Sequence, residues 1–362
     1  MNAKTLIRRR SLVQGLASRR FATEVDVLEW MVAMQSQERS VAPWSLGQRT
    51  RNRKESDVLR AISDGRIIRT HVLRPTWHYV RAADARWLLE FSAPRVHAAN
   101  RYYYGSVGLD SKALVKGAQV VAQVLEGEQH RTRNEIAEEL TARGGTWEGF
   151  RLAYLLMYAE LERVICSGAP KGKHHTYALF DERVGPSETL SRDEALARLT
   201  LAYFRSRGPA TVKDFCAWAT LTVADATRGL AIVASELERV DVDARTYWFS
   251  ESVDARARLS RTAHFLQGYD EYFMSYRESR GLAFPKKSAS APSGDQVPFI
   301  HAAILHGQVV AHWRRKVHGD HVQLETGVTK SLSRTGRDAL ARAAGEYARF
   351  LGVPVDLTMD VD

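Results

Sequence analysis

Two glutamines one residue apart, Gln35 and Gln37, lie in the segment EWMVAMQSQERSVAPW, residues 29–44. A carboxamide cannot take up a proton at pH 7, but its carbonyl oxygen can orient a water molecule and stabilise developing positive charge. Residues two apart on a helix point about 200° away from each other. We therefore expect the helix that begins near Glu24 to end around Met34, so that an extended chain places both carboxamides on one side. Alone, the pair is a weak signal, because solvated glutamines at helix ends are common.

A second set of candidate residues lies in the segment RTHVLRPTWHYV, which has the alternation of a β-hairpin. An aromatic ring beside cationic side chains suits phosphate contact or base stacking. A half-buried strand with the tryptophan in the core is equally compatible with the pattern. If the segment is a strand, His71 and Trp77 share one face and Arg74 and His78 share another, although Pro75 can shift the register. The candidate DNA-binding residues here are Arg69, His71, Arg74, Trp77 and His78.

Two acidic residues, Asp270 and Glu271, lie in the polar aromatic segment YDEYFMSYRESR. The alternation of the overlapping segment HFLQGYDEYFMSYR predicts a strand here. They could belong to a catalytic site, but we expect ion pairs with Arg277 or Arg280 instead. These two arginines are also candidate DNA contacts. The Gly-, Pro-, Ser- and Lys-rich segment that follows, residues 281–298, predicts a flexible surface loop.

Basic residues and histidines gather near the C-terminal end of the chain. Arg314, Arg315 and Lys316 lie in the predicted hairpin HWRRKVHGDH and are candidate contacts to a DNA strand. The nearby histidines have irregular spacing and no cysteine beside them, so we predict no metal site. These histidines are His301, His306, His312, His318 and His321.

The composition of the 362-residue chain, with 44% hydrophobic and 26% charged residues, is that of a globular protein. The formal net charge of +10 favours a polyanionic partner. The cysteines, Cys166 and Cys216, fit neither a disulfide framework nor a metal site. Neither a signal peptide nor a membrane span is predicted. We expect a monomeric cytoplasmic protein associated with the nucleoid.

One pattern, a helix pair followed by an alternating hairpin, occurs three times and is typical of a winged helix. The clearest copy is the second, which opens with a predicted capping box of Thr132 and Glu135. Winged helices usually contact nucleic acid. The predicted fold class is therefore α+β and mainly helical, with three tandem winged-helix units and a C-terminal β-rich part that form a concave DNA-binding surface. The predicted domains are 1–126 (first winged helix with the glutamine pair and linking helices), 127–186 (second winged helix), 187–255 (third winged helix) and 256–362 (β-rich part with a late helix).

The motifs MQSQ…APWSLGQRT, RTHVLRPTWHYV, RGPATVKDFCAWATL, YDEYFMSYRESR and GQVVAHWRR occur in this order. Together they resemble the AlkZ/YcaQ-like DNA glycosylases of the winged-helix DNA-binding family, from about residue 5 to 350. The resemblance implies that Gln35 and Gln37 match a Q-x-Q or Q-x-D pair that supports hydrolysis of the N-glycosidic bond of N7-alkylated guanine. Ser36 departs from the aliphatic residue that is commoner at the centre of the motif.

On this resemblance we expect a monofunctional DNA glycosylase acting on duplex DNA that contains alkylated guanine, with bulky adducts and interstrand crosslinks as further substrates. No metal or nucleotide cofactor is expected, because phosphate-loop and nucleophile-elbow motifs are missing. Strand cleavage through a Schiff base is not expected, since the lysine nearest in sequence to the glutamine pair is Lys54. The alternative is a non-catalytic tandem winged-helix protein, either a transcription regulator or a repair accessory factor.

Overall fold

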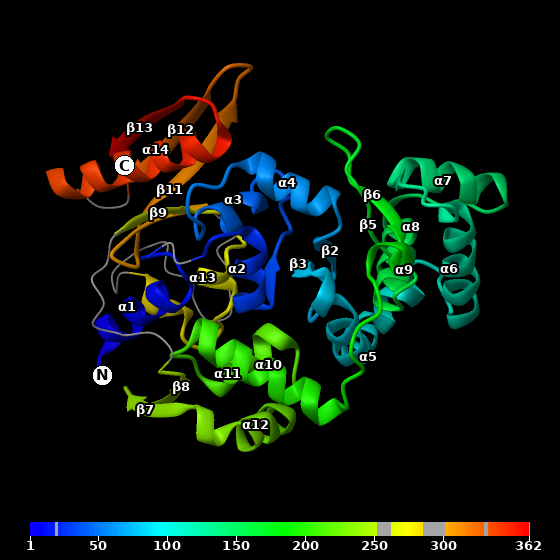
Figure 1. Ribbon diagram of the computed structural model, residues 1–362, viewed down its shortest axis with the longest axis horizontal. Helices are drawn as coiled ribbons and strands as arrows, with labels where there is room; N and C mark the ends of the chain where they lie inside the picture. The colour runs from blue at the N-terminus through cyan, green and yellow to red at the C-terminus, as the bar shows by residue number, and fades with distance from the viewer. Residues whose placement is uncertain (19–20, 252–261, 285–300, 329–331, 362) are drawn as a thin grey trace. The chain divides into compact units, whose positions relative to one another are not determined.

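The computed structural model describes residues 1–18, 21–251, 262–284, 301–328 and 332–361. The chain forms two compact units (Figure 1). The first unit combines Met1–Val58 with Ala197–Asp362, and the second unit is Leu59–Leu196. Both units mix helices with small sheets.

The C-terminal part of the first unit is a five-stranded sheet in the order β13-β12-β11-β10-β9. Neighbouring strands are antiparallel except β12 and β13, which are parallel. Helix α14 packs against this sheet and against α3 (Ala42–Gly47), and it carries buried apolar residues at helical spacing, including Leu340, Tyr347 and Phe350. The predicted β-rich part and its late helix are confirmed. The elements are β9 Ala263–Leu266, β10 Ala302–Leu305, β11 Gln308–Val317, β12 Val322–Val328, α14 Arg334–Leu351 and β13 Val355–Val361.

One segment that the sequence predicted as strand is helical. Residues Glu271–Met274 form the short helix α13, because the side chain of Asp270 caps its first turn by accepting a hydrogen bond from Tyr272 N at 2.9 Å. The 3-10 helix η2, Arg280–Ala283, follows. The loop predicted over residues 281–298 lies outside the described residues from position 285 onward.

Several of the remaining helices of the first unit begin with polar caps, whereas α3 follows Val41 and has no side-chain cap. Capping boxes are present before α2 (Thr23 with Asp26) and before α11 (Thr211 with Asp214). The elements are α1 Ala3–Val13, α2 Glu24–Met31, β1 Ala33–Gln35, α3 Ala42–Gly47, α10 Arg192–Arg207, α11 Val212–Ala219, α12 Val223–Ile232, η1 Ala234–Glu236 and the hairpin β7 Glu238–Val242 with β8 Arg245–Phe249. Helix α4, Glu55–Ser63, crosses into the second unit, and α10 begins just before the second unit ends.

The second unit packs its helices around an apolar core to which Val121, Leu155 and Ile165 belong. It contains the hairpin formed by β2 and β3 and a three-stranded sheet in the order β4-β6-β5. The predicted capping box of Thr132 and Glu135 is present at the start of α7. The elements are β2 Ile67–His71, β3 Trp77–Arg81, α5 Ala82–Ser106, α6 Ser111–Leu125, β4 Arg131–Thr132, α7 Arg133–Ala142, α8 Gly149–Leu161, β5 Ile165–Ser167, β6 Thr176–Leu179 and α9 Phe180–Arg183.

The three predicted hairpins and the predicted linking helices are therefore present. The hairpins are β2–β3, β5–β6 and β7–β8, and the linking helices are α5 and α6. Whether each helix–hairpin set is a winged helix, and where the domains divide, remain predictions.

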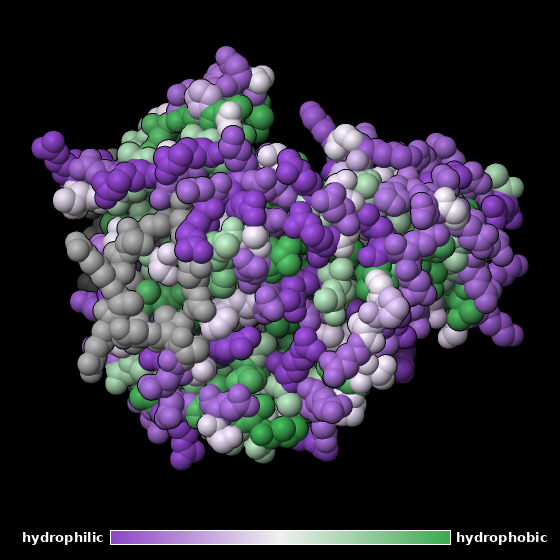
Figure 2. Space-filling model, viewed as in Figure 1, coloured by the Kyte–Doolittle hydropathy of each residue, from purple (hydrophilic) through white to green (hydrophobic). Residues whose placement is uncertain are grey.

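Most of the face shown in Figure 2 is hydrophilic, with an apolar area over α12. The exposed apolar side chains of this helix are Val223 and Ile232 at its two ends. Of the helices in the described ranges, none is both long and apolar enough to cross a membrane.

Candidate active site

The segment that carries both glutamines, residues 32–37, leaves helix α2 through an unusual backbone conformation. Val32 has φ 63° and ψ −54°, while its N–H still donates to Leu28 O at 2.7 Å. A β-branched residue rarely adopts a positive φ, and such strained positions cost about 1–3 kcal/mol. The chain then continues as strand β1, which ends at Gln35. The predicted break is confirmed, three residues earlier than Met34.

The two carboxamides differ in exposure. The side chain of Gln35 is buried, with 5% of its surface exposed, and Ser36 is fully buried. Gln37, beyond the end of β1, is exposed to solvent. One glutamine is therefore fixed by packing, and the other is accessible.

A buried arginine holds the backbone on both sides of Val32. Arg207, at the end of α10, donates from Nη1 to Met31 O at 2.8 Å and from Nη2 to Ala33 O at 2.7 Å. Its side chain has no exposed surface. Because one rigid guanidinium binds both carbonyl groups, it fixes the turn at Val32.

A buried glutamate holds the backbone at Gln35 itself. Oε1 of Glu271 accepts a hydrogen bond from Gln35 N at 2.9 Å. Oε2 accepts hydrogen bonds from Trp218 Nε1 at 2.9 Å and Ser275 Oγ at 2.7 Å, and it pairs with Arg207 Nη2 at 3.0 Å. Both oxygens of this carboxylate are thus engaged, which favours an ionised structural anchor over a free general base.

The chain that follows Gln37 is also anchored. Nε2 of His301 lies 3.3 Å from Oε2 of Glu38, and this hydrogen bond lowers the pKa of the Glu38 carboxyl. Arg315 donates to Ser40 O at 2.5 Å and to Tyr347 Oη at 2.6 Å. The glutamines therefore sit on a short segment that is fixed upstream and downstream.

The predicted acids are ion-paired, but with other arginines than expected. Asp270 pairs with Arg49 at 2.7 Å and Glu271 pairs with Arg207, instead of Arg277 or Arg280. Both pairs are completely buried. Arg207 was not among the predicted site residues, although it is the first residue of the motif RGPATVKDFCAWATL. The one feature of the sequence that could have indicated Arg207 is its position as a charged residue at the end of a predicted helix.

In the second unit, the β2–β3 hairpin brings three of its candidate residues together. His71 and Trp77 are cross-strand partners with ring centroids 4.1 Å apart, which confirms that they share a face. The guanidinium of Arg69 lies 4.0 Å from the centre of the Trp77 ring. Trp77 also packs against the apolar core and lies 5.0 Å from the His175 ring, so its surface is largely occupied by protein. This arrangement favours the core interpretation of Trp77 over base stacking.

A buried glutamate from α8 orients the histidine of this hairpin. Nδ1 of His71 makes a short hydrogen bond to Oε2 of Glu160, which is fully buried. Burial raises the pKa of the Glu160 carboxyl, against the lowering effect of His71 and Arg69. In the turn between the strands, Arg74 Nη2 lies 3.1 Å from His78 Nε2. Arg74 and His78 are therefore in contact, although Arg74 lies in the turn and not on the strand face that the spacing predicted.

The other candidate DNA contacts differ widely in accessibility. Arg280 is buried and donates from Nε to Phe273 O at 3.2 Å, which does not support a DNA contact. Arg315 is used by the internal contacts described above. Lys316 is exposed and pairs with Glu325 at 2.6 Å. Arg277 and Arg314 are exposed as well.

The C-terminal histidines occupy separate environments. His301 stacks on Trp313 with ring centroids 4.6 Å apart, and His318 stacks on His321 at 4.4 Å. Within the part of the chain that the structure describes, no group of three histidine, cysteine or acidic side chains is arranged to hold a metal ion.

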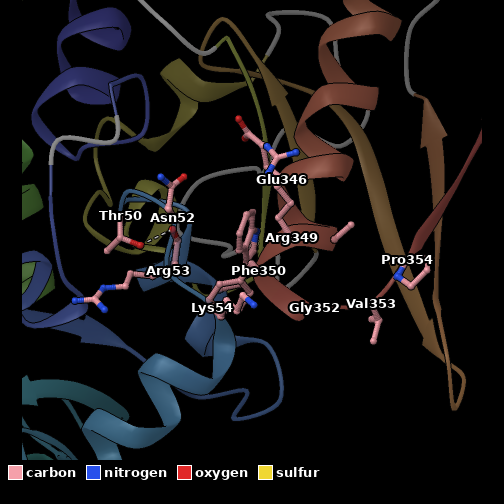
Figure 3. A pocket seen from close by; sticks show the side chains of 13 residues that line it. Thr50, Asn52, Arg53, Lys54, Glu346, Arg349, Phe350, Gly352, Val353 and Pro354 are labelled. Carbon is pink, nitrogen blue, oxygen red and sulfur yellow. Dashed lines mark hydrogen bonds between the residues drawn. The ribbon is translucent and has the colours of Figure 1, made fainter.

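A cavity of about 670 Å³ in the first unit lies away from the glutamine pair (Figure 3). Its lining comes from residues 44–54 and from the end of α14 with the residues after it, including Arg53, Arg349 and Phe350. Neither glutamine contributes to it. We therefore place the candidate site at the anchored glutamine segment and not in this cavity.

Comparison with known proteins assigns the chain to a class of enzymes. The sequence model of the family described as DNA glycosylase AlkZ-like matches residues 28–350. The chain belongs to this family, which confirms the resemblance inferred from the ordered motifs, and it is accordingly a hydrolase of N-glycosyl bonds.

Individual relatives agree with this assignment. The chain is similar to the interstrand DNA cross-link repair glycosylase of Streptomyces sahachiroi, with 24% identity over 355 residues and 94% of each protein covered. Its fold is similar to that of the solved DNA glycosylase AlkZ of Streptomyces sahachiroi, with a TM-score of 0.80 at 20% identity, over 99% of this chain and 100% of the other.

Proposed function

We propose that this chain is a monofunctional DNA glycosylase that hydrolyses the N-glycosidic bond of cationic N7-alkylguanine in duplex DNA. The observation that carries the proposal is the pair of neutral carboxamides, Gln35 and Gln37, on a segment anchored at both ends. Their proposed role is to position the water that attacks the sugar.

The chemistry explains why carboxamides suffice. Hydrolysis of a nucleoside passes through a transition state with oxocarbenium character. An unmodified purine must be protonated before it leaves, and this step needs a general acid. Guanine alkylated at N7 already carries a positive charge and leaves without protonation. The enzyme then has to place a water and stabilise the developing charge, which carboxamide oxygens can do.

The environment of the glutamine segment fits a mechanism in which the enzyme positions a water and does not protonate the leaving group. Glu271 is the carboxylate that contacts the backbone of Gln35, and it is paired with Arg207 and donors from two other side chains. A carboxylate whose two oxygens are both engaged in this way suits a structural anchor better than a general base. An enzyme with this site would be limited to leaving groups that are already activated.

The name of a relative bears on the size of the alkyl group that the site would accept. Because the Streptomyces relative is named as an interstrand DNA cross-link repair glycosylase, we extend the proposed substrates to bulky adducts and crosslinks. Strand cleavage is not part of the proposal.

For DNA binding we propose that the three helix–hairpin sets are winged helices that contact the phosphate backbone of duplex DNA as a monomer. The net charge of +10 supports a largely electrostatic interaction. Among the candidate contacts, we prefer the exposed Arg277 and Arg314 and the half-buried Arg74 over Arg69, which is buried against Trp77.

The proposed function is tested by base release from duplex DNA that contains 7-methylguanine. Purified protein should release 7-methylguanine without added cofactor, and a chelator should leave the rate unchanged, because the proposed chemistry uses no metal. Binding of the duplex without release of the base would favour the non-catalytic alternative. Loss of activity with chelator and its recovery with zinc would direct attention back to the histidines between His301 and His321.

A further inference from the structure

We infer that Arg207 and Glu271 are positioning residues that set the backbone of the glutamine segment and thereby aim the carboxamide of Gln35. This inference rests on the proposed function of Gln35. It assigns a role in catalysis to two buried residues that neither donate a proton nor touch the DNA.

The two residues bind the segment at three successive points. Arg207 binds the carbonyl groups of Met31 and Ala33, at 2.8 and 2.7 Å. Glu271 binds the amide of Gln35 at 2.9 Å. The ion pair between Arg207 and Glu271, at 3.0 Å, connects these contacts into one rigid group. Every backbone contact in this group lies at or just before Gln35, so a shift of the pair would move that residue directly.

The conformation that they hold would not persist without support. Val32 lies between the two carbonyl groups bound by Arg207 and has φ 63°. Positive φ is unfavourable for a β-branched residue, and such positions persist only where the surrounding structure fixes them. Without the arginine, the chain between α2 and β1 would relax, and the side chain of Gln35 would change direction.

A neighbouring ion pair provides a matched control. Asp270 precedes Glu271, is equally buried, and pairs with Arg49 at 2.7 Å. Its other side-chain partners are Ser45 and Gln48 of the α3 region and the backbone N–H of Tyr272, and none of them belongs to the glutamine segment. Asp270 therefore tests the cost of losing a buried carboxylate in the same unit without loss of a contact to the glutamine segment.

The test is single-turnover release of 7-methylguanine by Glu271→Gln at saturating enzyme, compared with Asp270→Asn. A glutamine at 271 cannot accept from Gln35 N and also from both Arg207 and Trp218, since its amide nitrogen is a donor. We expect Glu271→Gln to slow base release about 10 to 100-fold, because small misplacement of a catalytic group has effects of this size. Affinity for undamaged duplex should stay within about twofold, and Asp270→Asn should stay within about threefold of the wild-type rate.

A double-mutant cycle separates positioning from general loss of structure. If Glu271 acts through Gln35, the Glu271→Gln substitution should slow a Gln35→Ala protein by less than about threefold. Ser275→Ala supplies a milder variant should Glu271→Gln not fold. It removes one donor to Glu271, at 2.7 Å, and the nearer of two acceptors of Arg207 Nε, at 2.9 Å. Ser275→Ala should slow release about two- to fivefold, and this effect should also be lost in the Gln35→Ala background.

The outcomes are distinguishable. If Glu271→Gln and Ser275→Ala release base at the wild-type rate while Gln35→Ala is slow, the positioning role is wrong and the proposed function stands. Equal slowing by Asp270→Asn and Glu271→Gln, or full additivity with Gln35→Ala, would also overturn the positioning role. If Gln35→Ala itself is as fast as wild type, the proposed function fails first.

Discussion

Each unit of the chain buries a glutamate beside candidate site residues, and the two glutamates differ in how fully they are paired. In the first unit, Glu271 has an arginine and three further donors around its two oxygens. In the second unit, Glu160 has His71 on Oε2, while its Oε1 accepts no hydrogen bond from the described residues.

The difference has consequences for charge. A carboxylate with an arginine and several N–H or O–H donors is stable as an anion even when it is buried. A buried carboxylate with one histidine partner is not, and burial indeed raises the pKa of Glu160. We therefore regard Glu271 as an anchored carboxylate that organises the backbone. Glu160 is a carboxyl group that burial shifts toward its neutral form.

The largest expected effect comes from removal of the arginine in the first unit. Arg207→Met leaves Glu271 as an unpaired buried charge and should destabilise the fold by about 3–5 kcal/mol. Urea unfolding at neutral pH measures the change. A loss below about 1 kcal/mol would show that Glu271 does not depend on its arginine and would remove the contrast with Glu160.

A smaller effect is expected at Glu160 and should depend on pH. A carboxyl whose pKa is raised on folding contributes stability that is fully present below its unfolded value, near 4.5, and is lost as pH rises through the folded value. Glu160→Gln has no such proton, so the stability of the wild type relative to this variant should fall as pH rises above about 4.5.

The measurement is urea unfolding of both proteins across this pH range. The groups that face Glu160 are His71, Arg69, Cys166 and Tyr177, and they are the same in both proteins. If the wild type instead became more stable relative to Glu160→Gln as pH rises, His71 would stabilise the ionised carboxylate more than burial destabilises it.

The smallest expected effects concern two neighbouring arginines on β11, which show the same distinction between internally paired and accessible charge. Arg315→Ala should lose its contacts with Ser40 and Tyr347 and destabilise the fold by about 1–2 kcal/mol. Arg314→Ala should leave stability unchanged but reduce the log–log salt slope of DNA binding, expected near −5, by about 1. Thermal unfolding and fluorescence anisotropy at several salt concentrations measure both, and the reverse pattern would contradict the assignment of Arg314 to the DNA surface.

The sequence predicted the secondary-structure elements better than it predicted the partners in the buried ion pairs. The hairpins, the late helix α14 and the break after α2 followed from alternation, helical spacing and capping residues, all of which act over a few positions. The ion pairs did not follow, because Glu271 and Arg207 lie 64 residues apart and nothing local indicates which arginine a buried acid will meet. The strand expected at residues 271–274 was wrong because the cap supplied by Asp270 outweighs the alternation of its aromatic residues.

The sequence predicted which residue types form the candidate site, but not the contacts that hold the glutamine segment in place. The two glutamines could be named because their spacing suits one water and because the ordered motifs resemble a glycosylase family. The turn at Val32 and the guanidinium that binds both sides of it depend on tertiary packing. A sequence pattern carries no signal for a strained valine, since the residue itself is unremarkable there.

The central claim is that Gln35 and Gln37 position the water for base release, and single-turnover kinetics with 7-methylguanine in duplex DNA tests it most directly. Replacement of either glutamine by Ala should slow release roughly 10 to 1000-fold, with DNA affinity measured in parallel almost unchanged because neither side chain is charged. Gln37→Asp should remain active, since a carboxylate can orient the same water and act as a base. Wild-type rates for both Ala variants would contradict the account and leave the glutamine pair as a polar end to the helix.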